Sequence, residues 1–111
     1  MTVQKLIESG QFETVHVGAD VGKPIKTPYC CDLLSIAMGK APEGCAWITV
    51  MGNINTLAVA ALTDAACIIL AEGVSLDEAA LQKAKEQEIT VLRTEKPVFE
   101  GALEVYRLIN A

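Results

Sequence analysis

The sequence predicts a single α/β domain over residues 1–111, with a four-stranded, largely parallel β-sheet and helices on both faces. Residues 46–50 and 66–70 are continuous apolar runs, which is typical of parallel strands that are covered on both faces. A helical segment, 55–62, separates them, and right-handed crossovers then place helices on the sheet. The composition, 51% hydrophobic with only 5% aromatic residues, favours an α/β core over a β-sandwich.

The N-terminal part of the chain predicts a short helix and a first strand. Thr2 is a suitable N-cap for the helix, and Gly10 is a suitable end. Residues 13–17, ETVHV, alternate in polarity and include β-branched side chains, as strands do. The apolar stripe of the helix consists of Val3, Leu6 and Ile7.

A long loop and a second helix are expected next. Residues 18–28, GADVGKPIKTP, contain two glycines and two prolines and predict an irregular connection. Pro28 is expected to open a helix over residues 29–39, which Gly39 ends. The side chains of this helix that are expected to face inward are Leu33, Leu34, Ala37 and Met38.

The C-terminal half predicts helices that alternate with strands. Ser75 is the expected N-cap of the next helix, because Glu78 lies three residues further on and completes a capping box. Pro97 suits the first position of the last helix. The expected ranges are 76–87 and 97–109 for these two helices and 89–92 for the strand between them.

Charge and apolar patterning exclude several classes of partner. The formal net charge is −5 and there is no basic run, so we expect no nucleic-acid or membrane-surface partner. The longest apolar stretch is interrupted by Asn53, Asn55 and Asp64, and the N-terminus has no signal-peptide core. We therefore expect a cytoplasmic protein.

The cysteines predict reduced thiols rather than a metal site. Cys30 and Cys31 are adjacent, Cys45 is expected in a loop, and Cys67 lies in an apolar strand. There is no C-x-x-C motif, and one histidine is too few for a usual mixed zinc site. A redox or metal role stays open for Cys30, Cys31 and Cys45 if the fold brings them together, but no metal and no cofactor is expected.

Candidate ligand residues follow three predicted strands. In open α/β sheets, ligands bind beyond the carboxyl ends of parallel strands. The residues at these positions are Gly52, Asn53 and Asn55, then Glu72 and Gly73, then Arg93. Glycine permits close backbone approach, helix N-termini attract anions, and arginine binds phosphate or carboxylate. The alternatives are that Asn53 or Asn55 caps a helix and that Arg93 pairs with Glu95 or Glu72.

Motifs for catalysis are weak. Residues 18–24, GADVGKP, are one residue too short for a phosphate-binding P-loop, and Pro24 occupies the position that needs a hydroxyl. His16 has no evident partner and is expected to be structural. Since catalysis needs several groups in defined roles, we expect no enzyme activity.

The run 48–94, ITVMGNINTLAVAALTDAACIILAEGVSLDEAALQKAKEQEITVLRT, resembles the DRTGG domain family and is similar to the N-terminal domain of HPr kinase/phosphorylase. The motif that names the family is degenerate. Gly52, Asn53 and Ile54 stand at its Gly-Asp-Arg turn, and residues 71–73, AEG, stand at its Thr-Gly-Gly turn. The resemblance implies an α/β fold, a non-catalytic regulatory role and a tendency to dimerise.

Together, these features predict a homodimeric regulatory domain that binds a small anionic metabolite or nucleotide at the carboxyl ends of its strands. The alternative is a module for interaction with a separate protein partner or for dimerisation, without a small ligand. A small enzyme is the less favoured third hypothesis.

Overall fold

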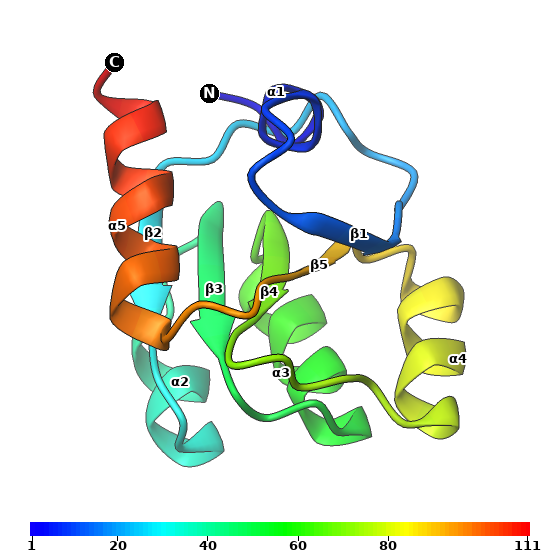
Figure 1. The fold of residues 1–111 in the computed structure, drawn as a ribbon. Coiled ribbons are helices and arrows are strands. Elements are labelled where there is room, and N and C mark those ends of the chain that lie inside the picture. The colour runs from blue at the N-terminus through cyan, green and yellow to red at the C-terminus, as the bar shows by residue number, and fades with distance from the viewer.

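The computed structural model describes all 111 residues. Its β-sheet has five strands, and Figure 1 shows the sheet between two layers of helices. The strand order is β1-β5-β4-β3-β2; β2 to β5 are parallel, and β1 pairs antiparallel with β5. The sheet is therefore mixed. The elements are α1 (Val3–Glu8), β1 (Glu13–His16), β2 (Thr27–Cys30), α2 (Leu34–Lys40), β3 (Cys45–Thr49), α3 (Ile54–Thr63), β4 (Cys67–Leu70), α4 (Glu78–Gln87), β5 (Val91–Arg93) and α5 (Val98–Ile109).

The helices cover both faces of the sheet, as predicted. Strands β2 to β5 lie side by side in chain order, so right-handed crossovers place α2, α3 and α4 on one face. Helices α1 and α5 cover the other face. The two cores lie on opposite faces of the sheet, because successive side chains of a strand point to opposite faces. Ile48 of β3 belongs to the core that contains Leu6 and Val105. Trp47, the residue before it, belongs to the core that contains Leu57 and Ala84.

The prediction of four strands was wrong because β2 was not recognised. Residues Thr27–Cys30 pair with β3 at the edge of the sheet, whereas Pro28 was expected to open a helix. An edge strand tolerates proline because one side of its backbone has no strand partner. The sequence TPYC has neither an apolar run nor clear alternation, so it carries little strand signal.

Helix α2 is shorter and more exposed than predicted. It starts at Leu34 and runs past Gly39 to Lys40, so Gly39 does not end it. Among the four side chains expected to face inward, only that of Ala37 is fully buried; Leu33 is 55% and Met38 is 52% exposed. A helix beside an edge strand has less sheet to cover, and its apolar residues stay at the surface.

The helix caps agree with the sequence in part. Thr2 Oγ1 accepts from Lys5 N at 3.2 Å, as predicted for the start of α1. The Ser75 capping box was wrong, because Asp77 Oδ1 accepts from Ala80 N at 2.8 Å and starts α4 instead. Aspartate is as good an N-cap as serine, and two candidates two residues apart cannot be distinguished by pattern alone. Pro97 is the N-cap of α5 rather than its first helical residue.

Two cysteines lie deep in the sheet. Cys45 begins β3 and is fully buried, which corrects the expected loop position, and Cys67 is fully buried in β4 as predicted. Burial raises the pKa of Cys45 to about 11 and that of Cys67 to about 12. Cys30, by contrast, is exposed. No group of three or more His, Cys, Asp or Glu side chains is placed to hold a metal ion.

Candidate functional site

The structure places all six predicted ligand residues at the carboxyl ends of β3, β4 and β5, on one edge of the sheet. The loops after β3 and β4 touch at Gly52. A Cβ atom on Gly52 would lie 2.5 Å from Ser75 O, and Asp77 N donates to Gly52 O at 3.4 Å. Only glycine permits this approach, because a side chain at position 52 would clash with Ser75 O. The two loops can therefore lie in contact.

The side chain of Asn53 caps α3. Asn53 Oδ1 accepts from Asn55 N at 2.9 Å and from Thr56 N at 3.3 Å. Of the two candidate caps, it is therefore Asn53 that serves, and the side chain of Asn55 lies at the surface. An N-terminus already capped in this way retains the positive end of the helix dipole, which favours a nearby anion.

Next to this cap lies a buried hydroxyl without a partner. Thr56 is fully buried, and its Oγ1 is the buried side-chain polar atom for which no hydrogen bond is formed. An unpaired buried hydroxyl costs free energy, and it lies in the first turn of α3 close to the edge that carries the predicted residues. The sequence contained no signal for it.

The loop after β4 is held by backbone contacts to the segment after β5. Glu72 N donates to Lys96 O at 2.9 Å, and Gly73 N donates to Thr94 O at 3.0 Å. Glu72 has a φ of 56° and Gly73 a φ of 73°, so the chain turns sharply here. The carboxylate of Glu72 is exposed and belongs to none of the ion pairs.

Arg93 clamps this loop from β5. Its Nη2 donates to Gly73 O at 2.6 Å and its Nε to Val74 O at 3.2 Å. The predicted partner Glu95 lies 3.4 Å from Nη2, whereas Glu72 does not pair with it. A closer partner is Glu13 of β1, whose Oε2 lies 2.7 Å from Nη1.

A cavity of about 340 Å³ opens beside Arg93. Of the six predicted residues, only Arg93 lines it; its other lining residues are Glu13, Val15, Ser75, Leu76 and Leu81. Sequence reasoning missed Glu13 as a site residue, because the pairing of β1 with β5 joins segments far apart in the chain. It assigned Ser75 to a helix cap instead of to a ligand site. The cavity offers a guanidinium, a hydroxyl and apolar walls, which suits binding of a small polar molecule.

Asp32 is a further residue that sequence reasoning missed at this edge. Its Oδ1 accepts from Thr49 Oγ1 at 2.7 Å and from Val50 N at 2.9 Å, which ties the end of β2 to the end of β3. The carboxylate satisfies two donors at the start of the 50–53 loop. Its role became visible only with β2, which the pattern of the sequence did not reveal.

No protein-family model and no curated protein sequence matches the chain. Among solved structures, the fold is similar to a regulatory region that combines CBS and DRTGG domains. The likeness supports a DRTGG-like fold, which is what the resemblance of residues 48–94 implied.

That structure is the regulatory region of Clostridium perfringens pyrophosphatase, complexed with its activator diadenosine tetraphosphate. The TM-score is 0.72 at 14% sequence identity, and the likeness covers 92% of this chain. It covers 44% of the other chain, so this chain spans less than half the length of the structure that it matches. None of the helices here is long and apolar enough to cross a membrane.

Proposed function

We propose that this chain is a non-catalytic, cytoplasmic regulatory domain that binds a small anionic metabolite or nucleotide at the carboxyl edge of its sheet. The residues proposed to form the site are Gly52, Asn53, Asn55, Glu72, Gly73 and Arg93. The likeness to a regulatory region that is complexed with a nucleotide activator supports this class of function. The contact between the two loops at Gly52 supports one shared site rather than two.

The observation that carries the proposal is the environment of the Arg93 side chain, which lines a cavity and pairs only with exposed carboxylates. Its side chain is 22% exposed and lines the cavity of about 340 Å³. Its two carboxylate partners are far more exposed, since the side chains of Glu13 and Glu95 are 64% and 79% exposed. Exposed ion pairs contribute little to stability, so an anionic ligand group replaces Glu13 at Nη1 at small cost.

The proposal is tested by thermal shift with nucleotides, acyl phosphates and small carboxylates. A ligand that binds only the folded state raises the melting temperature. We expect the Glu13→Gln variant to strengthen binding, because it removes the carboxylate that competes for Arg93. An Asn53→Ala, Glu72→Ala double variant is expected to weaken the binding of nucleotides, because a carboxylate at a strand end accepts from a ribose hydroxyl.

The matched control is Glu43→Gln. Glu43 forms an exposed ion pair with Lys26 at 3.4 Å, away from the proposed site, so this variant changes the net charge equally. If Glu43→Gln strengthens binding as much as Glu13→Gln does, the effect is one of net charge and the proposed site is wrong. A screen without any ligand-dependent rise would also reject the proposal.

The alternative function is dimerisation or docking on a separate protein, and one observation favours it. Leu33, Ile36 and Met38 expose 55%, 46% and 52% of their area on and beside α2, next to the edge strand β2. Exposed apolar patches and unpaired strand edges are common interaction surfaces. Light scattering of the chain and of an Ile36→Asp variant tests it, and a monomer at all concentrations would exclude the homodimer.

A further inference from the structure

A second cavity lies at the opposite edge of the sheet, where β4 and β5 begin and where α3 and α4 end. Its volume is about 320 Å³, within the range of small-molecule sites. Ala19, Asp20 and Lys23 of the long loop line one side of it. This is the glycine-containing loop that lacks the features of a P-loop, and the carboxyl-edge function leaves it without a role.

The loop is fastened to the body of the domain at both ends. At one end, Gly18 N donates to Thr90 Oγ1 at 2.9 Å. A Cβ atom on Gly18 would lie 1.9 Å from Glu88 O, so the backbone passes directly over the end of α4. At the other end, Lys23 Nζ pairs with Asp64 at the end of α3. The loop that borders the cavity is therefore held in place at both of its ends.

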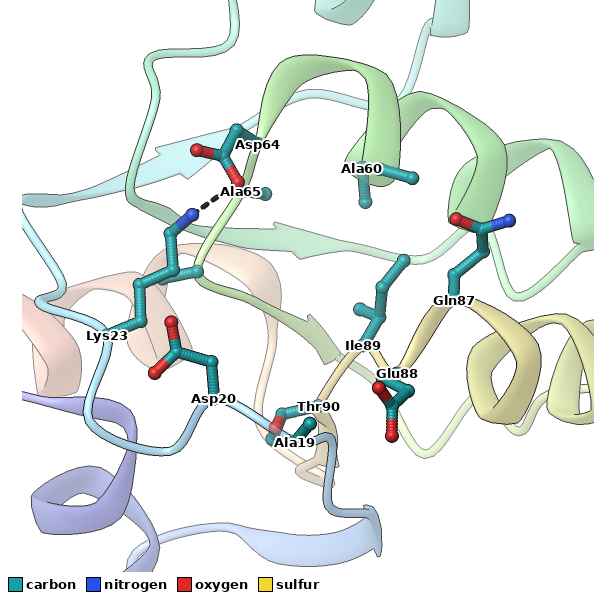
Figure 2. A pocket seen from close by; sticks show the side chains of 12 residues that line it. Ala19, Asp20, Lys23, Ala60, Asp64, Ala65, Gln87, Glu88, Ile89 and Thr90 are labelled. Atoms are coloured by element: carbon teal, nitrogen blue, oxygen red, sulfur yellow. Dashed lines mark hydrogen bonds and ion pairs between the residues drawn. The ribbon is translucent and has the colours of Figure 1, made fainter.

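The lining combines apolar and acidic surfaces. Figure 2 shows Asp20, Lys23 and Asp64 on one side and Gln87, Glu88 and Ile89 on the other. The remaining lining residues are small, mainly the alanines at 60, 61, 65 and 66. Three carboxylates and one ammonium give the lining a formal net charge of −2.

Both neighbouring helices add to this negative potential. Asp64 and Glu88 are the C-caps of α3 and α4, with left-handed φ values of 58° and 54°. The negative ends of two helix dipoles therefore meet at the cavity, and this arrangement favours cations. Lys23 pairs with Asp64 only, which leaves Asp20 and Glu88 outside every ion pair.

We propose that this cavity binds a small organic cation, with an ammonium or guanidinium group on a short aliphatic chain. The charged group lies between Asp20 and Glu88, and the aliphatic chain lies on the alanine methyl groups and Ile89. A bare metal ion does not fit, because the three carboxylates of the lining do not form a group that could hold one. The site is at the other edge of the sheet from Arg93, so it is independent of the function proposed above.

The test uses agmatine and putrescine as probes, with 1,4-butanediol as an uncharged probe of similar length. Binding is measured by calorimetry, and its place by the methyl NMR signals of Ala60, Ala61 and Ala65. We expect saturable binding of the amines, shifts of these methyl signals, and no binding of the diol.

Two variants separate the site from the overall charge of the chain. An Asp20→Asn, Glu88→Gln variant is expected to bind the amines at least about tenfold more weakly, or about 1.4 kcal/mol. The matched control is Glu8→Gln, Glu86→Gln, which removes two exposed carboxylates that do not line the cavity. An Ala61→Leu variant fills the cavity without a change in charge and is expected to abolish binding.

Three results would overturn the proposal. The first is equal binding by the two double variants, which would mean that amines associate with the acidic surface in general. The second is amine binding that survives Ala61→Leu. The third is the absence of alanine methyl shifts at millimolar amine.

Discussion

Arg93 Nη1 of β5 lies 2.7 Å from Glu13 Oε2 of β1, across 80 positions of sequence. This contact fastens the antiparallel strand pair at the edge of the sheet. The same guanidinium also holds two carbonyls of the loop after β4. Arg93 thus joins three segments that meet only in the folded chain.

Removal of the Arg93 side chain is expected to destabilise the fold, mainly because two backbone carbonyls lose their hydrogen-bond donor. Arg93→Ala leaves Gly73 O and Val74 O without their charged donor and is expected to lower the free energy of unfolding by about 2 kcal/mol. Glu13→Gln removes only an exposed ion pair and is expected to cost less than about 1 kcal/mol. Urea denaturation of both variants measures the two values. Equal losses would mean that the ion pair, not the carbonyl contacts, dominates.

Two glycines are expected to respond in opposite directions to alanine. At Gly52 the new Cβ atom meets Ser75 O at 2.5 Å, so Gly52→Ala is expected to cost about 2 kcal/mol through overpacking. At Gly39, within α2, a Cβ atom meets nothing within 4 Å. Gly39→Ala is expected to stabilise the chain by about 0.5–1 kcal/mol through helix propensity. Thermal denaturation of the two variants measures both changes in stability. A destabilised Gly39→Ala variant would contradict the helical conformation of Gly39.

The N-cap of α4 is Asp77, whereas the sequence pattern predicted Ser75. Asp77→Ala is expected to cost about 1 kcal/mol, because Asp77 Oδ1 accepts from Ala80 N. Ser75→Ala is expected to leave the stability nearly unchanged, since Ser75 does not cap the helix. Chemical denaturation of the two variants compares them directly. A larger loss for Ser75→Ala would restore the capping box that the structure rejects.

The buried hydroxyl of Thr56 predicts a stabilising substitution. Thr56 Oγ1 has no partner, so Thr56→Val replaces an unsatisfied polar atom with a methyl group of the same shape. We expect the free energy of unfolding to stay the same or to increase by up to about 1 kcal/mol. The melting temperature, which measures the effect, is then unchanged or higher. A clear loss of stability would show that the hydroxyl has a partner, for example a bound water.

The buried thiols predict a loss of stability at high pH. Their pKa values, about 11 for Cys45 and about 12 for Cys67, lie above the ordinary value of 9.0, so folding holds both thiols neutral. This contribution is complete below pH 9 and is lost as the pH rises toward 11–12, because only the unfolded chain then releases the protons. Urea denaturation midpoints measured between pH 7 and 10.5 test whether stability falls with pH. An increase of the midpoint when the pH is raised beyond 9 would contradict the prediction.

The same burial predicts which thiols react. In the native protein at pH 8, a disulfide reagent is expected to modify at most the exposed Cys30 and the half-buried Cys31. All four thiols are expected to react in denaturant. Rapid reaction of Cys67 in the native state would mean that β4 opens locally.

The sequence by itself determined the class of fold and most of its elements. The apolar runs of β3 and β4 are buried on both faces, and that burial writes a continuous hydrophobic signal into the chain. The preference of Thr and Asn for N-cap positions identified Thr2 as a cap and limited the cap of α3 to Asn53 or Asn55, of which Asn53 is the one used. The six residues at the strand ends could be placed on one edge because all parallel strands end there.

Only the tertiary structure decided how these parts meet. Strand β2 exists because β3 offers it an edge, and its own sequence carries too little pattern to show this. The partners of Arg93, the contact of Gly52 with Ser75 and the passage of Gly18 over α4 all join segments that are distant in the chain. Such contacts depend on three-dimensional closeness, which no local pattern encodes. For the same reason, both cavities became visible only in the folded chain.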